Sequence, residues 1–394
     1  MITKRSKVFA LLAIALLAIN LRTAVSSISP VVTFIQKDIP LPIITLGLLG
    51  VAAPLAFAIA TSLSYRPTRR FGVEKTVVLI VSMIVSGHLL RGFAWDSSAL
   101  FAGSLLALLG AGMGNVLLPV MVRKYFSSRV GLISSFYITL TAISATTTSL
   151  IAVPVASAFG WRFSLGQWAF LAILTVIPLI ALWANSKPEP ARVDAISKKA
   201  IWKSPTAWAI AGVQGMTSVF GYVSFAWLPL LLIEHNGVSV ETGGLMLSLF
   251  ALMGLPASLL VPVLAARNPS SHRLIIWFSG LTGMIGPLGI LWGSNDSLWI
   301  WVILTGLGPS MFPLALTLYN LRARERSTVL SVSAFGQGVS YVTATIAIFA
   351  VGVIREISGG WEFALWMLFG FAALSVVLGY QIGKNHFVDD ELAH

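Results

Sequence analysis

The stretch "GAGMGNVLLPVMVRKYF", residues 110–126, decides the class of fold to which this chain belongs. It opens with three glycines among small apolar residues, carries one polar side chain at Asn115, and ends at the cations Arg123 and Lys124. In a water-soluble helix, each of these glycines would cost roughly 1 kcal/mol relative to alanine. In a membrane, small residues instead allow helices to pack with their backbones in close contact. The stretch is therefore typical of a membrane helix that ends at a charged loop.

The composition of the whole chain supports this interpretation. Of its 394 residues, 57% are hydrophobic and 10% are charged, whereas a globular protein carries about 25% charged residues. So few charges cannot cover a water-facing surface, and we predict a multi-pass membrane protein. The net charge is +12, and in a membrane protein we expect this excess of cations on the cytoplasmic side. The expected partner is therefore the lipid bilayer, and no nucleic acid.

Residues that support catalysis or metal binding are sparse. The chain has no cysteine, and no two of its five histidines are spaced to share a metal ion on one helix face. It has no Walker motif for binding ATP. An enzyme within the membrane would need a serine–histidine pair, paired carboxylates or a metal cluster at membrane depth, and the sequence shows none of these. We therefore expect no catalytic residues, no metal and no cofactor.

Apolar runs of roughly 20 residues, the length that crosses a bilayer, recur along the chain. Prolines inside several runs are compatible with membrane helices, because neighbouring helices satisfy the freed backbone groups. The sequence therefore predicts an all-α membrane protein with twelve transmembrane helices. The predicted spans are residues 7–31, 42–63, 75–94, 99–122, 130–157, 163–184, 206–231, 242–264, 274–293, 297–320, 328–353 and 362–383.

The cations are distributed unequally between the two sides that these spans define. Of the 26 lysines and arginines, one side holds only Lys37, Arg91, Arg162 and Arg355, and Arg22 lies inside the first span. The amino terminus, the alternate loops and the carboxyl tail hold all the others. Because positive residues remain on the cytoplasmic side, we expect both termini in the cytoplasm. The expected location is a bacterial-type cytoplasmic (inner) membrane.

The two halves of the chain resemble each other. The segment "LLGAGMGNVLLP" at 108–119 is echoed by "LTGLGPSMFP" at 304–313, and "GWRFSLGQWAFLA" at 160–172 by "GWEFALWMLFGFA" at 360–372. Between the halves lies the longest polar stretch, 185–205, which is basic. This order predicts a duplicated six-helix unit joined by a linker. The expected domains are a first bundle at 1–184, a cytoplasmic linker at 185–205, and a second bundle with a short cytoplasmic tail at 206–394.

Four segments carry a family pattern: "NLRTAVSSISPV" (20–31), "RRFGVEKTVVL" (69–79), "GNVLLPVMVRKYF" (114–126) and "GWRFSLGQWAFLA" (160–172). With them, the whole chain resembles the major facilitator superfamily and, within it, the cyanate and 2-nitroimidazole porter family. The second loop departs from the superfamily pattern, because Tyr65 replaces a glycine, Arg69 replaces an acid, and Glu74 comes late. The resemblance implies a major facilitator fold of two pseudo-symmetric six-helix bundles. It also implies transport of small molecules by alternating access.

Arg22 is the one ion that the predicted spans place deep in the bilayer. All 14 acids then lie in loops, tails or at helix ends, so no carboxylate is available to pair with it. A charge at the bilayer centre costs roughly 2.5–3.5 kcal/mol, and arginine does not escape by losing its proton. Either an anionic or hydrogen-bond-accepting substrate completes the site, or Arg22 extends to the interface or binds backbone carbonyl groups. We favour the substrate, because Ser26 and Ser29 continue the polar face.

Polar residues also recur at every fourth position on three other predicted spans, so that each set shares one helix face. Together with the asparagine in the opening stretch, these side chains either line a substrate cavity or form hydrogen bonds between helices. The candidates are Asn115 on the fourth span, Tyr137, four residues before Thr141, on the fifth, Gln214, Ser218 and Tyr222 on the seventh, and Gln337 and Tyr341 on the eleventh.

The function that follows from these features is secondary transport of a small molecule. We expect a monomer that moves a small anionic or polar, hydrogen-bond-accepting solute, cyanate-like or nitroimidazole-like, across the membrane by alternating access. The direction of transport and the coupling ion stay open. The alternative within the same fold is an exporter of antimicrobial or multiple drugs.

Overall fold

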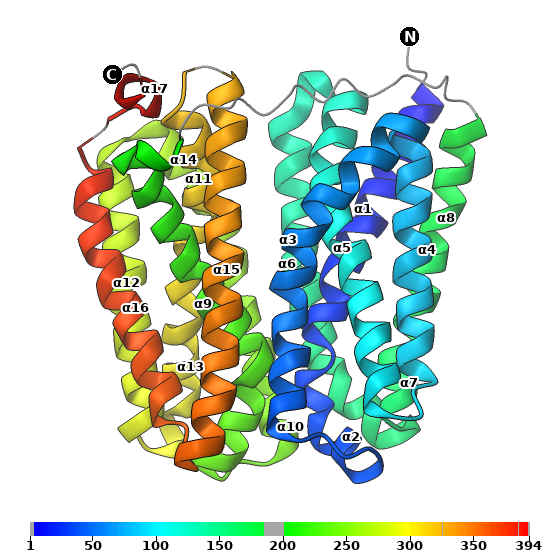
Figure 1. The fold of residues 1–394 in the computed structure, drawn as a ribbon, viewed down its shortest axis with the longest axis vertical. Coiled ribbons are helices and arrows are strands. Elements are labelled where there is room, and N and C mark those ends of the chain that lie inside the picture. The colour runs from blue at the N-terminus through cyan, green and yellow to red at the C-terminus, as the bar shows by residue number, and fades with distance from the viewer. Residues whose placement is uncertain (1–3, 185–200, 325, 385, 393–394) are drawn as a thin grey trace. The chain divides into compact units, whose positions relative to one another are not determined.

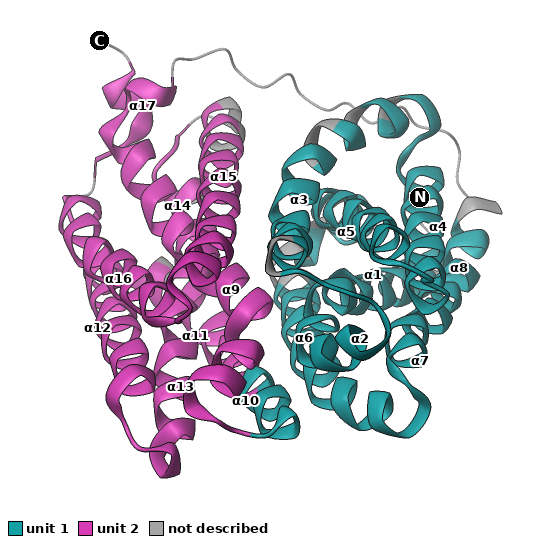
Figure 2. Cartoon of the chain, turned by 60° about the horizontal axis from the view of Figure 1, so that its bottom comes forward, with its two compact units in different colours: residues 1–193, 239–248 teal, residues 194–238, 249–394 magenta. Residues whose placement is uncertain are grey.

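The computed structural model describes residues 4–184, 201–324, 326–384 and 386–392, and in these residues it consists of helices and their connections, without β-strands (Figure 1). The chain forms two compact units, one of residues 1–193 with 239–248 and the other of residues 194–238 with 249–394 (Figure 2). Of the expected linker 185–205, residues 185–200 lie outside the described part. A short 3-10 turn, η3 (Ile201–Lys203), follows them.

The helices up to residue 184 coincide with the first six expected spans. The first span bends, because α1 ends at Ser26 and a 3-10 turn, η1 (Ser29–Val31), precedes α2. The sixth span is divided at Gln167. The helices are α1 (Lys4–Ser26), α2 (Val32–Asp38), α3 (Ile43–Phe71), α4 (Val73–Gly92), α5 (Ser97–Tyr125), α6 (Val130–Phe159), α7 (Trp161–Gly166) and α8 (Trp168–Ala184).

The helices from residue 205 onward coincide with the last six expected spans. The eighth and tenth spans are each formed by two helices, and a short helix lies near the carboxyl end. The helices are α9 (Pro205–Asn236), α10 (Val240–Leu252), α11 (Gly254–Arg267), α12 (Ser270–Trp292), α13 (Leu298–Leu307), α14 (Phe312–Leu321), α15 (Arg326–Ser358), α16 (Glu362–Ile382) and α17 (Val388–Glu391).

The length and hydropathy of these helices suit a membrane. Among the described residues, 11 helical stretches are long and apolar enough to cross a bilayer. The expected span at 42–63 corresponds to α3, in which the stretch Thr45–Ala60 is a shorter apolar helix. The prediction of an all-α membrane protein is therefore confirmed.

The opening stretch of the sequence lies in α5, the central helix of the first unit. A Cβ atom at Gly110, Gly112 or Gly114 would come within 2.8, 2.7 or 2.6 Å of a side chain on α4, α3 or α1, respectively. Real Cβ atoms essentially never show contacts this short, so a side chain at any of the three positions would force a neighbouring residue to shift, on a different helix each time. The three glycines therefore permit the close packing that membrane helices use in place of large side chains.

Prolines explain two interruptions that the sequence patterns did not predict. Pro256 has no N–H for the carbonyl group of Leu252, and α10 ends at that residue. In the tenth span, Pro309 lies in a 3-10 turn, η5 (Gly308–Met311), between α13 and α14. The matching segment of the first unit has no proline before Pro119, and α5 continues through it without a break.

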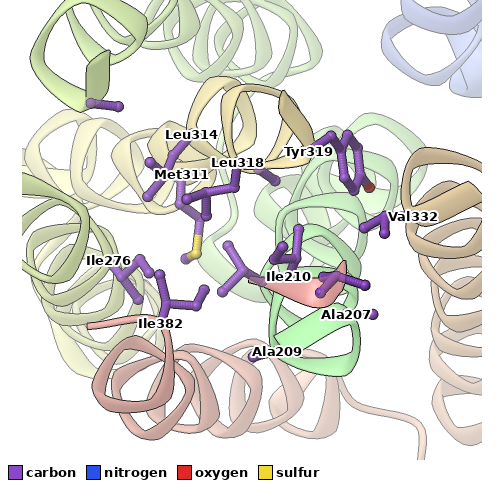
Figure 3. Packing of buried hydrophobic residues seen from close by; sticks show 14 of the residues in the cluster. Ala207, Ala209, Ile210, Ile276, Met311, Leu314, Leu318, Tyr319, Val332 and Ile382 are labelled. Carbon is purple, nitrogen blue, oxygen red and sulfur yellow. The ribbon is translucent and has the colours of Figure 1, made fainter. Parts of the chain in front are cut away.

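Apolar side chains of α9, α12, α14 and α16 fill the interior of the second unit (Figure 3). Ile210, Ile276 and Leu318 have no exposed surface there. Tyr319 belongs to the same cluster and brings a hydroxyl group into it. A buried hydroxyl needs a hydrogen-bond partner, and its partner is one of the expected site residues.

Candidate functional site

Arg22 lies next to the point where α1 packs closely against α5. Leu21 is fully buried, and its side chain occupies the space beside Gly114. The next residue on each helix is an expected site residue, Arg22 on α1 and Asn115 on α5, and both are half-buried. Within the described part of the chain, neither side chain has a hydrogen-bond or ion-pair partner. The first unit thus carries a guanidinium group and an amide at the residues that directly follow one close helix contact.

Hydrogen bonds fix the position of α1 around Arg22. Asn20 donates a hydrogen bond to the hydroxyl of Thr175 on α8 over 3.3 Å. The hydroxyl of Thr23 lies 3.1 Å from Nε2 of His88 on α4. Both of these α1 residues are buried. The backbone that carries Arg22 is therefore held from two sides, which reduces the freedom that a solute would otherwise have to restrict on binding.

Arg91 is a buried cation near the end of the expected span 75–94, and the sequence interpretation gave it no role in the site. It lies in the last turn of α4 and has no exposed surface. Its Nη2 donates to the hydroxyl of Ser27 over 2.9 Å, and its Nη1 to the carbonyl oxygen of Ala24 over 3.4 Å. Because α1 ends at Ser26, its last carbonyl groups lack helical partners and attract a cation. Arg91 therefore binds the carboxyl end of α1.

In the second unit, two of the three expected site residues on one face of α9, a set that we call the α9 stripe, are bonded to neighbouring helices. The side-chain oxygen of Gln214 accepts a hydrogen bond from the hydroxyl of Tyr319 on α14. The hydroxyls of Ser218 and Ser340 lie 2.6 Å apart and join α9 to α15. Gln214 and Ser218 are both buried. These contacts favour hydrogen bonding between helices over cavity lining for the two residues. Tyr319, which fell on no stripe in the sequence, was missed.

The tyrosines of the stripes are more exposed. Tyr222 on α9 and Tyr341 on α15 form an edge-to-face ring pair with centroids 6.4 Å apart, and both are half-buried. Gln337 donates to Ser333 of its own helix over 3.0 Å, so its amide is bound locally. Tyr137 on α6 is half-buried, and no described residue accepts a hydrogen bond from it. The structure therefore brings together Tyr222 and Tyr341, and leaves Tyr137 in the first unit.

Glu74, the acid that comes late in the second loop, belongs to the first turn of α4. Its carboxylate lies 2.7 Å from Nζ of Lys124 and accepts a hydrogen bond from the hydroxyl of Tyr125. Both partners lie in the last turn of α5, so this acid joins the ends of two helices of the same unit. Every other acid that the structure describes also lies within a turn of a helix end or in a connection.

The polar groups that lack partners suit binding rather than catalysis. A guanidinium group offers five N–H donors in a planar fork, and an asparagine amide offers both donors and an acceptor. These groups fit a small solute with acceptor atoms. In the described residues, no three histidine, aspartate or glutamate side chains come together to hold a metal ion.

The family model of the Major Facilitator Superfamily matches residues 11–345 of the chain. This chain belongs to the Major Facilitator Superfamily. The protein is therefore a multi-pass membrane transporter, and its expected partners are a small-molecule substrate and the lipid bilayer.

Curated relatives of this superfamily member match it over nearly their whole length. It is 29% identical over 379 residues to the uncharacterized transporter YycB of Bacillus subtilis (strain 168), covering 95% of this chain and 93% of the relative. It is 27% identical over 384 residues to the 2-nitroimidazole transporter of Escherichia coli (strain K12), covering 97% of each. It is 26% identical over 384 residues to the cyanate transport protein CynX of the same organism, covering 93% and 94%. The resemblance to this porter family is therefore confirmed.

A solved structure confirms the fold of this superfamily member. A bacterial homologue of the human lysosomal transporter Spinster, in an inward-facing and occupied conformation, superposes with a TM-score of 0.74. The two sequences are 15% identical, and the superposition covers 98% of this chain and 99% of the other. At this identity the likeness establishes the shared fold, and it carries no information on the solute.

Proposed function

We propose that this superfamily member is a secondary active transporter of a small anionic or polar, hydrogen-bond-accepting solute. The solute resembles cyanate or a nitroimidazole, and alternating access moves it across the membrane. Relatives named for 2-nitroimidazole and cyanate support this substrate class, because they match nearly the whole chain. Neither the relatives nor the contacts favour the multidrug alternative.

The observation that carries the proposal is the difference between two arginines. Arg91 is buried and bonded to Ser27 and to a helix carbonyl group. Arg22 is half-buried and has no partner within the described residues. A solute with an anionic or strongly accepting group would supply that partner through a charge-assisted hydrogen bond. In this proposal Arg22 is the central substrate contact, and Asn115 is its neighbour on α5.

The remaining expected site residues receive unequal roles in this proposal. Tyr222, Tyr341 and Tyr137 are half-buried and contribute ring surface and hydroxyl groups to the solute site. Gln214 and Ser218 are buried in bonds between helices and serve to position α9. The amide of Gln337 contacts the solute only after its hydrogen bond to Ser333 has broken.

The proposal includes the arrangement in the membrane. We place both termini in the cytoplasm of a bacterial cell, in the inner membrane, because the cations concentrate on that side. We also propose a monomer of two six-helix bundles, at 1–184 and 206–394, joined by the cytoplasmic segment 185–205. Because the chain lacks cysteine, single cysteines introduced in the loops report the side directly. Labelling of the 185–205 segment from outside the cell would reject this orientation.

Thermal stability with added solute tests the binding claim on purified protein. A solute at 100 times its dissociation constant stabilises the folded state by about 2.7 kcal/mol. We expect cyanate or 2-nitroimidazole to raise the melting temperature of the wild type. Arg22→Lys keeps the charge but loses the planar fork, so the affinity should fall by about tenfold or more. Arg22→Ala should abolish the shift and keep the melting temperature of the solute-free protein.

Arg129 provides a matched control, because it is exposed and far from α1 in the sequence. Arg129→Ala removes the same positive charge and should keep the wild-type response to both solutes. If Arg22 instead holds helices together, Arg22→Ala should melt early and the surviving protein should still bind. A well-folded Arg22→Ala protein with wild-type affinity would reject Arg22 as the substrate contact.

A further inference from the structure

Each unit contains an acid that binds one tryptophan and one arginine, and we call each such group a clasp. The first clasp consists of Asp38, Trp161 and Arg162. Oδ2 of Asp38 accepts hydrogen bonds from the indole N–H of Trp161 over 2.9 Å and from Nη1 of Arg162 over 2.7 Å. The guanidinium of Arg162 lies 4.2 Å from the Trp161 ring centroid, and its Nε donates to the carbonyl oxygen of Ala94. The first clasp thus joins α2 to the start of α7.

The second clasp consists of Glu234, Trp361 and Arg355. Oε2 of Glu234 accepts hydrogen bonds from the indole N–H of Trp361 over 2.8 Å and from Nη2 of Arg355 over 2.6 Å. The guanidinium of Arg355 lies 5.7 Å from the Trp361 ring centroid. This clasp joins the last turn of α9 to the turn before α16. In both clasps a single carboxylate oxygen accepts from an indole and a guanidinium.

The clasps occupy matching places in the two halves of the sequence. Each acid lies where the first span of its half ends, and each tryptophan lies where the last span begins. The tryptophans are aligned in the repeated segments "GWRF" and "GWEF". Gly160, with a φ of +85°, directly precedes Trp161, and Gly359, with a φ of +72°, lies two residues before Trp361. Such a backbone conformation favours glycine, so a glycine turn lies shortly before the indole in both halves, one residue earlier in the second.

The arginines do not match in the same way. Arg162 is aligned with Glu362 in the repeat, and the second clasp takes its arginine from the end of α15 instead. Simple duplication of a sequence leaves equal residues at aligned positions. The two clasps therefore combine the same three groups with arginines from unmatched sequence positions. This indicates that the combination of acid, indole and guanidinium has a function of its own.

Added stability is a poor explanation of this recurrence. The side chains of Asp38 and Arg162 are 49% and 41% exposed, and those of Glu234 and Arg355 are 34% and 27% exposed. Ion pairs exposed to this extent contribute little to the free energy of folding. The clasps can instead act through geometry, because one carboxylate oxygen fixes the orientation of both the indole and the guanidinium group.

We propose that the two clasps position the ends of the helices that carry the substrate contacts and thereby set the rate of alternating access. This inference rests on the proposed transport function. Arg22 lies on α1, which reaches the first clasp through the bend and α2, and Tyr222 lies on α9, which reaches the second clasp directly. A clasp makes the first span of a half move together with its last span. Conformational steps of this kind limit the turnover of many proteins.

Neutral variants of the acids test this positioning role. Asp38→Asn and Glu234→Gln each remove the charge and keep the size of the side chain. In proteoliposomes, we expect each variant to lower the maximal transport rate by about fivefold or more, with the dissociation constant unchanged within about twofold. Asp38→Glu and Glu234→Asp keep the charge and should restore most of the rate. The matched control is Glu356→Gln, since Glu356 is exposed and adjacent to Arg355 but outside the clasp.

Hydrogen exchange of backbone amides provides a second readout that needs no solute. Asp38→Asn should increase exchange in residues 32–38, Glu234→Gln should increase it in residues 230–236, and Glu356→Gln should leave both segments unchanged. Increased exchange in a protein that moves none of the tested solutes would reject the proposed function and retain the role of the clasps in positioning these helices. Wild-type rates together with unchanged exchange in the two neutral variants would overturn the proposal.

Discussion

Arg22 belongs to the carboxyl half of α1 and Arg91 bonds to the end of the same helix, but their surroundings differ. Arg91 has no exposed surface and depends on Ser27 and Ala24 for its hydrogen bonds. Arg22 is half-buried, and its guanidinium lacks a partner within the described residues. A buried charge needs hydrogen-bond or ionic partners inside the protein, whereas a charge at a solute site can take its partner from the bound solute. Arg91 therefore holds the end of α1 in place, and the proposal assigns Arg22 to the solute.

Replacement of Ser27 by alanine tests this division of roles. Ser27→Ala leaves Nη2 of Arg91 buried without its 2.9 Å acceptor. A hydrogen bond to a charged group contributes about 1.5–3 kcal/mol, so the melting temperature should fall clearly. The control is Ser82→Ala, because Ser82 is exposed and its hydroxyl donates to the carbonyl oxygen of Val78 on its own helix. Equal melting temperatures for the two variants would contradict the role given to Arg91.

The sequence identified Arg22 and missed Arg91 for a physical reason. An arginine in the middle of a long apolar run is conspicuous, because its cost in a bilayer is high. Arg91 lies near the end of its span, where arginines commonly extend into water. Inside the protein it donates a hydrogen bond to the carbonyl group of Ala24, 67 residues earlier in the chain, which no local sequence pattern reveals. The sequence held one weak indication that Arg91 is buried. Gly87 lies one turn before it on the same helix, and a glycine allows another helix to pack closely there.

At the scale of helices, the crossing of α4 and α5 depends on the absence of a side chain at Gly87. A Cβ atom at this position would lie 2.4 Å from the backbone nitrogen of Ala107. Gly87→Ala would force the two backbones apart, and overpacking of this kind costs about 1–3 kcal/mol. We expect a lower melting temperature and weaker binding of any solute that Arg22 contacts.

Gly221 on α9 provides the matched control. A Cβ atom there would meet nothing within 4 Å. Gly221→Ala should leave stability unchanged or raise it, because alanine favours the helical state by up to about 1 kcal/mol. A Gly87→Ala protein at least as stable as Gly221→Ala would show that the two helices separate without cost.

The sequence predicted which polar residues share a helix face, but it did not predict their hydrogen-bond partners. Spacing at every fourth residue correctly indicated that Ser218 and Tyr222 share one side of α9, which packs on α15. Whether each side chain lines a cavity or bonds to another helix depends on the neighbouring helix. Tyr319, the partner of Gln214, lies on α14 and belongs to no stripe. The breaks beside Leu252 and at Gly308–Met311 were missed because prolines within membrane spans were treated as tolerated.

At the scale of the whole molecule, hydropathy was sufficient to predict the class of fold. Each expected span coincides with helix, because a bilayer forces the backbone to satisfy its own hydrogen bonds. The repeat and the family pattern added the architecture of the superfamily. The solute was not predictable to the same degree, since it is chosen by a few side chains. Orientation in the membrane likewise stays a prediction from the distribution of cations.

Uptake of a labelled solute by proteoliposomes without ATP tests the central claim most directly. We expect wild-type protein to take up cyanate or 2-nitroimidazole faster than protein-free liposomes, and unlabelled solute to compete with this uptake. We also expect a folded Arg22→Ala protein to stay at the background rate, while Arg129→Ala transports as the wild type does. Uptake of both solutes at the background rate by wild-type protein, or transport by Arg22→Ala at the wild-type rate, would contradict the account.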